Sequence, residues 1–314
     1  MCGVSHTGGA PWEPRVEQVI GEYDMCLMFS SQFATVYRDR ANSLILKRFK
    51  NDTYITEKYH LNELFKNDVI KSHIPCIVEY NDKERFILMN YKGVDGIELI
   101  NAGKYRSKHW ELYIKQCVPL VSEIIKLGYV HRDIKPENVV YDEASGLWSF
   151  IDFGFMECKK MTRNNSFKGT YPYCMPLLGN KRMLHKFLQH NKLSDIKPAG
   201  DYYGFAMSAL SMWGHNHESD GCRVNLDLVH IYDIILTGMN SVLCALARIV
   251  MACVDYDYGT LSWGPPVECK FITKVDIDWG GLHFEPNVEK CWGHLVDTII
   301  KKQKVPLRQC LNLQ

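Results

Sequence analysis

The stretch His131-Arg132-Asp133-Ile134-Lys135-Pro136-Glu137-Asn138 is the part of this sequence from which the fold can be inferred. Asp133 and Asn138 lie five residues apart, with Lys135 between them. A carboxylate can accept the proton of an attacking hydroxyl, an amide oxygen can hold Mg²⁺, and an ammonium can neutralise charge on a phosphoryl group. These side chains are the ones that phosphoryl transfer needs, and a chance surface loop is the alternative.

A second acidic motif lies further along the chain. Asp152-Phe153-Gly154 begins nineteen residues after Asp133 and follows the apolar run Leu147 to Ile151. An aspartate at the end of a strand, next to a glycine, can chelate Mg²⁺. This position predicts one metal site made by Asn138 and Asp152, rather than an ordinary turn at Asp152.

Two charged residues lie among apolar neighbours near the start of the chain. The run Leu44 to Phe49 predicts a strand that contains Lys47. Such a lysine either extends along the strand edge to solvent or reaches inward to anionic oxygens. A helix is expected from about Tyr54 to Phe65, and Glu57 lies on its apolar face. A carboxylate on that face is costly unless it is paired.

Together these stretches resemble the motifs of eukaryotic-type protein kinases. His131 to Asn138 matches the pattern H-R-D-x-K-P-x-N at every fixed position, and Asp152 to Gly154 matches D-F-G. Leu44 to Lys47 resembles V-A-I-K, and Lys168 to Pro176 resembles G-T-x-x-Y-x-A-P-E. The motifs cover about residues 22–215.

The resemblance implies an α+β, bilobal fold. We expect residues 1–20 to form a loose leader and residues 21–314 to form one kinase domain. Its N-lobe, about 21–90, should be small and rich in strands with one helix, and its C-lobe, about 93–314, should be larger and mainly helical.

The resemblance also assigns roles in catalysis, with ATP and Mg²⁺ as cofactors. Asp133 would deprotonate the substrate hydroxyl, and Lys135 would stabilise the developing charge. Asn138 and Asp152 would hold the metal. Two further assignments complete this set: Thr170 would bond to Asp133 and Lys135, and Lys47, paired with Glu57, would bind the α- and β-phosphates. Glu63 is an alternative partner for Lys47 because its spacing is more usual for the family, but its helix face is more polar.

The nucleotide pocket implied by the resemblance departs from the family in one place. Phe29, Ser31 and Ala34 stand where a G-x-G-x-x-G hairpin would have glycines, which let a backbone approach phosphates closely. The other residues expected at the nucleotide, besides Ser31, are Val36 in the hairpin, Met89 at the back of the pocket, Asn90 and Lys92 in the hinge, and Val140 under the adenine.

Four further features concern the regulation and the large lobe of the expected kinase domain. Arg132 suggests a site for a loop phosphate on Thr162, Ser166 or Thr170. Asp201 is expected to accept bonds from the catalytic-loop backbone. Leu177 replaces the final glutamate of the A-P-E pattern. Helices are expected at Leu226 to Leu236, Asn240 to Cys253 and Val288 to Gln303.

Lys135 and Thr170 favour Ser/Thr hydroxyls of protein substrates as acceptors. A pseudokinase, a binding or scaffold module of kinase shape, is the alternative that the lost glycines favour. A phosphotransferase acting on small molecules is a third reading, and the Lys-Pro and G-T-x-x-Y patterns count against it. The compact size, the changed hairpin, Leu177 and the unusual C-lobe look similar to kinases of large DNA viruses.

Composition excludes several other classes. Lys plus Arg is 37 and Asp plus Glu is 36, so neither nucleic acid nor a membrane surface is expected as a partner. The twelve cysteines contain no C-x-x-C pair, which favours reduced thiols and a cytoplasmic or nuclear location, in a host cell if the protein is viral. The apolar window Ile234 to Val254 contains Arg248 and is expected to be a buried helix, not a membrane span.

Overall fold

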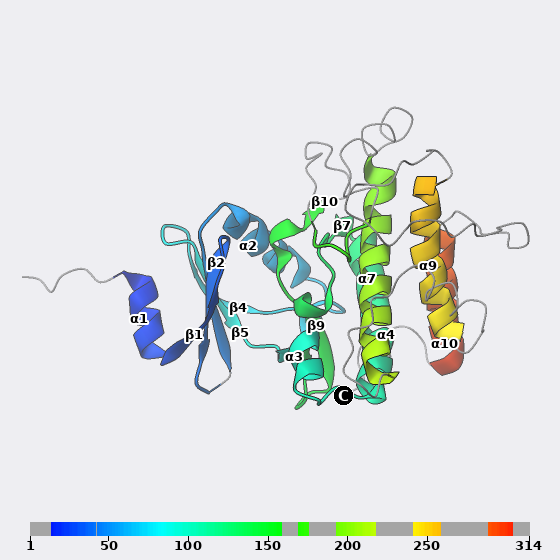
Figure 1. Ribbon diagram of the computed structural model, residues 1–314. Coiled ribbons are helices and arrows are strands. Elements are labelled where there is room, and N and C mark those ends of the chain that lie inside the picture. Colours follow the sequence, from blue (N-terminus) through cyan, green and yellow to red (C-terminus); the bar gives the residue numbers. More distant parts are fainter. Residues whose placement is uncertain are drawn as a thin grey trace, which may run out of the picture.

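The computed structural model describes residues 14–41, 43–158, 169–175, 193–217, 241–258 and 288–303. The chain forms a strand-rich small lobe, up to residue 90, and a mainly helical large lobe after it (Figure 1). The predicted α+β class is therefore confirmed. The predicted helix at 226–236 and the residues Thr162, Ser166 and Leu177 lie outside the described residues.

The small lobe is an antiparallel sheet of five strands in the order β1-β2-β3-β5-β4. The strands are β1 (Met25–Ser30), β2 (Ala34–Asp39), β3 (Leu44–Phe49), β4 (Ile77–Asn81) and β5 (Phe86–Asn90). Helix α1 (Arg15–Glu22) packs over one face of the sheet, and α2 (Thr53–Leu64) packs against the other. Side chains alternate along a strand, so the residues of β5 face both helices in turn. Phe86 and Leu88 pack on the face that α1 covers, whereas Ile87 and Met89 pack on the face that α2 covers.

Helix α1 corrects the expectation of a loose leader over residues 1–20. Val16 and Val19 are fully buried on the sheet, and the carboxylate of Glu84 accepts the first N–H groups of the helix, those of Arg15 and Val16, both at 2.9 Å. Helix N-termini have unsatisfied N–H donors and a partial positive charge, so a carboxylate from the β4–β5 turn stabilises this helix. From Arg15 on, the chain is part of the small lobe.

In its described residues, the large lobe contains two small sheets and a group of long helices (Figure 1). One sheet has the order β6-β8-β9, and β10 pairs with β7 in the other. The strands are β6 (Val94–Asp95), β7 (Tyr129–Val130), β8 (Val139–Asp142), β9 (Leu147–Phe150) and β10 (Glu157–Cys158). The helices are α3 (Gly96–Asn101), α4 (Ser107–Lys126), α7 (Leu193–His217), α9 (Ser241–Tyr258) and α10 (Val288–Gln303).

The core of the large lobe lies between α4, α7 and α10. Tyr113 of α4 stacks on Phe205 of α7, with ring centroids 5.0 Å apart. Trp292 of α10 meets Phe205 edge to face at 5.4 Å. Pro119 lies inside α4, which continues past it to Lys126. The described parts of the chain include no helix with the length and apolarity that crossing a membrane requires.

Helix α2 carries a matched pair of aliphatic side chains with which this packing can be tested. Leu61 is 1% exposed in the main core, whereas Ile55 on the same helix is 62% exposed. We expect Leu61→Ala to lower the free energy of unfolding by about 2–5 kcal/mol, because it leaves a cavity. Ile55→Ala should change it by less than about 0.5 kcal/mol. Urea denaturation of both variants checks this, and equal losses would contradict the assigned packing.

Candidate active site

Lys47 of β3 lies between two carboxylates that come from different parts of the chain. Its Nζ is 2.7 Å from Oε2 of Glu57 on α2 and 2.9 Å from Oδ1 of Asp152, which precedes the 3₁₀ turn Phe153–Phe155. Glu57 is buried on the inner face of α2. Glu63, the alternative partner, bonds instead to Lys66 at 2.5 Å. The structure thus selects Glu57 as the partner of Lys47.

The charges of this triad depend on one another. Burial raises the pKa of Glu57 to about 7, against the opposing effect of Lys47. Burial also opposes ionisation of Asp152, but the attraction and hydrogen bond of Lys47 outweigh it and lower the pKa of that carboxyl. For Lys47, burial disfavours the ammonium, and the two carboxylates more than compensate and raise its pKa. Lys47 therefore stays charged.

Gly154 packs closely against the start of α2, next to the triad. A Cβ on Gly154 would lie 3.3 Å from Cβ of Thr53 and 3.5 Å from Oε2 of Glu57. The first of these distances is tighter than most carbon–carbon contacts, so a side chain at position 154 would require a small shift at the start of α2. Phe153 is fully buried, with its ring 5.1 Å from that of His131.

The catalytic-loop residues predicted from the sequence meet at Asp133. Its Oδ1 accepts a bond from the Thr170 hydroxyl at 2.8 Å, and its Oδ2 accepts one from the Asn138 amide at 2.9 Å. Lys135 Nζ lies 3.0 Å from Oδ2 of Asp133 and 2.8 Å from Oγ1 of Thr170. These bonds hold the carboxylate in one orientation, because each of its oxygens has a fixed donor.

Asp201 of α7 holds the backbone of this loop, as the sequence predicted. Its carboxylate accepts the N–H groups of His131 at 2.6 Å and of Arg132 at 2.7 Å. Arg132 has a φ of 73°, in the left-handed region that non-glycine residues rarely adopt. Asp201 lies inside α7 rather than at its start, since the helix begins at Leu193. The bonds to Asp201 compensate for the unfavourable backbone conformation immediately before Asp133.

The side chain of Arg132 differs from the prediction. Its Nη1 donates to Oε2 of Glu157 at 2.5 Å, and Lys197 of α7 contacts the other oxygen of Glu157. The Thr170 hydroxyl bonds to Asp133 and Lys135, and a loop phosphate on Arg132 stays a prediction. Neither Glu157 nor Lys197 belongs to a motif, so no sequence pattern indicated a role for them.

Residues expected around the adenine lie along the junction of the lobes. Met89 is buried in β5, and Val36 of β2 pairs with Lys47 of β3. Val140 is buried on β8 opposite Asp95 of β6. The hinge approaches this small sheet closely, because Gly93 has a φ of 115° and a Cβ there would lie 2.1 Å from the Tyr141 carbonyl oxygen.

The hinge residues Asn90 and Lys92 are expected to meet the adenine through their backbone groups, and their side chains tie the hinge to the chain before β4. Asn90 Oδ1 accepts the N–H of Cys76 at 2.6 Å. Lys92 Nζ donates to the carbonyl of Ser72 at 2.8 Å, so its charge points toward residues 71–73. Of the backbone groups expected at the adenine, the N–H of Asn90 donates to the carbonyl of Cys76 at 3.1 Å.

The β1–β2 hairpin closes its own turn where a glycine-rich loop would not. Ser31 Oγ accepts the N–H groups of Phe33 at 3.1 Å and of Ala34 at 3.2 Å. Lys50 Nζ donates to Oγ of Ser30 at 2.8 Å and to the carbonyl of Ser31 at 2.6 Å. The polar groups of the hairpin are therefore satisfied by neighbouring side chains rather than by a ligand.

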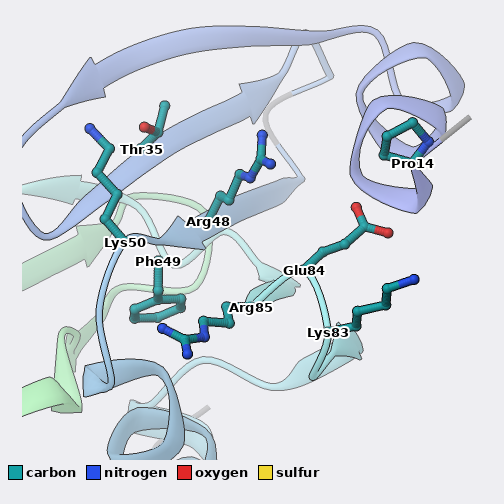
Figure 2. Close-up of a pocket in the computed structure, with 8 residues that line it drawn as sticks. All are labelled: Pro14, Thr35, Arg48, Phe49, Lys50, Lys83, Glu84 and Arg85. Atoms are coloured by element: carbon teal, nitrogen blue, oxygen red, sulfur yellow. The ribbon is translucent and has the colours of Figure 1, made fainter.

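One aromatic contact joins this hairpin to the turn after Asp152. Phe33 meets Phe155 edge to face, with ring centroids 6.3 Å apart. Figure 2 shows Lys50 extending from the end of β3 on the same side of the sheet as Thr35. The hollow drawn there lies at the outer end of the sheet, beside Pro14 and the β4–β5 turn. Neither Lys47 nor Asp133 lines it, so it is not the site described above.

Oxygen ligands suited to Mg²⁺ are present in the site. The amide nitrogen of Asn138 bonds to Asp133, which leaves its amide oxygen for a cation. Lys47 occupies Oδ1 of Asp152, which leaves Oδ2. Mg²⁺ takes one or two carboxylate or amide oxygens from a protein and completes its shell with water and phosphate oxygens, so this donor set fits the ion.

Comparison with known proteins agrees with this geometry. A family model described as a protein kinase domain matches residues 30–192, which is more than half of the chain. The chain belongs to the protein kinase family. This kinase is 29% identical over 161 residues to a probable serine/threonine-protein kinase of Dictyostelium discoideum, in a match that covers 47% of this chain and 34% of the relative. It is 36% identical over 160 residues to serine/threonine-protein kinase AtPK2/AtPK19 of Arabidopsis thaliana, with 46% and 33% covered.

The matches span only about a third of the length of these curated relatives. A solved structure, the PK-1 kinase of Cydia pomonella granulovirus, resembles this kinase with a TM-score of 0.52 at 14% identity. That match covers 77% of this chain and 92% of the viral one, and at this identity it shows a shared fold. The predicted bilobal kinase fold is confirmed.

His60 of α2 makes the placement of this helix sensitive to acid. Burial lowers its pKa to about 4 from an ordinary 6.5, while the unfolded chain takes up the proton below about pH 6.5. The free energy of unfolding should therefore fall as the pH drops from 6.5 to 4, by roughly 3 kcal/mol from this group. We expect His60→Gln to remove that part of the pH dependence in urea titrations. His294→Gln, at an exposed histidine of α10, should leave it unchanged, and equal behaviour of the two variants would contradict the assignment.

Proposed function

We propose that this kinase transfers the γ-phosphoryl group of ATP to serine or threonine hydroxyls of protein substrates. The observation that carries the proposal is the carboxylate of Asp133, held at both oxygens by Thr170 and Asn138 and accompanied by Lys135. Both relatives described above are named as serine/threonine-protein kinases, which supports serine and threonine hydroxyls as the acceptors.

Each residue of the site has a step in this proposal. Asp133 accepts the proton of the acceptor hydroxyl, and Lys135, 3.0 Å away, donates to the phosphoryl oxygens as charge develops. Lys47 uses two of its three N–H groups on Glu57 and Asp152, which leaves one for a phosphate oxygen. Asn138 and Asp152 would hold Mg²⁺. When bound, the ion neutralises phosphate charge and aligns the transferred group.

A second candidate function has one observation in its favour. In glycine-rich loops, free backbone N–H groups face the phosphates. Here Ser31 Oγ already accepts two of those N–H groups, from Phe33 and Ala34. A kinase-shaped binding module with weak or no catalysis is therefore the alternative. The two functions differ in one respect: the kinase transfers the γ-phosphoryl group of bound ATP, whereas the binding module does not.

The mechanism predicts that Asp133 is required for transfer and not for nucleotide binding. We expect Asp133→Asn to lower kcat by on the order of 10³-fold, because the general base is lost while shape is kept. The Kd of Mg·ATP should change by less than about threefold. Phosphotransfer to a mixed Ser/Thr substrate and ATP titration measure both. Equal activity of wild type and Asp133→Asn would exclude the mechanism, and binding without transfer in the wild type would favour the binding module.

The hairpin predicts a gain of affinity from a single substitution. Ser31→Ala removes the acceptor for the Phe33 and Ala34 N–H groups and leaves them for phosphate oxygens. We expect the Kd of Mg·ATP to fall by about 3- to 10-fold, the effect of one to two ordinary hydrogen bonds. Adenosine, which lacks phosphate, should bind both proteins equally. Weaker binding of ATP to Ser31→Ala would show that Ser31 organises the hairpin for the nucleotide instead of competing with it.

A further inference from the structure

Glu157 joins three parts of the large lobe through two buried cations. It is the first residue of β10, which pairs with β7 so that Glu157 lies opposite Val130. Its carboxylate bonds to Arg132 of the catalytic loop and contacts Lys197 of α7. The side chains of Arg132, Glu157 and Lys197 are 15%, 11% and 3% exposed. Arg132 immediately precedes Asp133 in the sequence, and this Arg132–Glu157–Lys197 cluster is almost closed to solvent.

The cluster supplies the anion that the cations need. A buried guanidinium or ammonium without a counter-charge is strongly unfavourable. Glu157 gives one carboxylate to both cations, and Asp201 gives a second to the backbone of His131 and Arg132. Both cations thus share the carboxylate of Glu157, while Asp201 holds the backbone beside them.

We propose, on the basis of the function proposed above, that Glu157 takes the place of an activation-loop phosphate and positions Asp133 through Arg132. A phosphate that stabilises an active site does so by giving Arg-pairable negative charge to a loop. Here the same charge is built into the chain, on the strand that follows the Asp152-Phe153-Gly154 motif. Phosphotransfer by this kinase then requires no phosphate on Thr162 or Ser166, the hydroxyl residues of positions 159–168.

The position of Arg132 explains how the charge reaches the reacting group. Arg132 is adjacent to Asp133 and has a left-handed backbone. Asp201 holds its N–H and Glu157 holds its side chain, so both ends of the residue are fixed. A phosphate brought to Arg132 would also meet the carboxylate of Glu157, and like charges repel. Glu157 is therefore a positioning residue that makes this place unfavourable for a phosphate.

The first test removes the loop hydroxyls. We expect the full chain with Thr162→Ala and Ser166→Ala, dephosphorylated with a phosphatase and checked by intact mass, to keep kcat within about twofold of the wild type. A loss of tenfold or more in this double variant would overturn the inference. A wild type that transfers no phosphate in any state would instead overturn the proposed function and the inference with it, so the two failures differ.

The second test changes Glu157 itself. We expect Glu157→Gln to lower kcat by about 10- to 100-fold, as small displacements of catalytic groups do, with the KM for ATP unchanged. Glu157→Asp, which keeps the charge, should recover part of the loss. Glu143→Gln, at an exposed glutamate of the β8–β9 turn, is the matched control and should have wild-type kcat.

A double-mutant cycle separates positioning from general stability. If Glu157 acts through Arg132, the effect of Glu157→Gln on kcat should largely disappear in an Arg132→Gln background. Thermal unfolding of each variant reports folding independently. Unchanged kcat in Glu157→Gln, or additive losses in the double variant, would overturn the proposed route from Glu157 to Asp133.

Discussion

The ion triad of Lys47, Glu57 and Asp152 is the interaction on which the arrangement of the site depends. It joins a strand of the small lobe, helix α2 and the chain that leaves the β9 strand of the large lobe. Burial opposes the charged forms of Lys47 and Glu57, whose side chains are 15% and 2% exposed, so each is stabilised by its partner. The lobes therefore meet where one lysine bonds to two carboxylates, and Gly154 packs close beside them.

The same principle holds at the catalytic loop. Two residues with left-handed backbones, Arg132 and Asp152, lie on either side of the site, at φ values of 73° and 63°. Each is held by charged partners, Arg132 by Asp201 and Glu157, and Asp152 by Lys47. Such backbone conformations persist only where surrounding contacts fix them. Buried charge in this chain is thus used to hold an otherwise unfavourable loop geometry around Asp133.

The hairpin shows a different solution at the nucleotide side. In a turn without glycines, every residue carries a Cβ atom, which keeps the backbone of the turn further from the phosphates. In this chain Ser31 and Lys50 satisfy the polar groups of the turn, and Phe33 packs on Phe155. Side chains of this chain thus bond to hairpin groups that a glycine-rich loop would offer to phosphate, which connects the loss of glycine to the question of how tightly ATP is held.

The sequence alone determined the protein family, the lobed α+β fold and the grouping of Asp133, Lys135, Asn138, Asp152 and Thr170. It could do so because those residues lie in motifs whose spacing is short and whose chemistry is specific. The apolar face of α2 was also readable, and it favoured Glu57 over Glu63.

Only the tertiary structure decided which distant charges meet. Lys50 binds the hairpin nineteen residues before it, at Ser31, and Lys197 reaches Glu157 across the large lobe. Helix α1 forms because the β4–β5 turn brings Glu84 to its first N–H groups. Glu157 has no pattern around it, and only the pairing of β10 with β7 sets it against Arg132. Local spacing encodes the chemistry of a motif, whereas the partner of a buried charge depends on which strands and helices the fold places side by side.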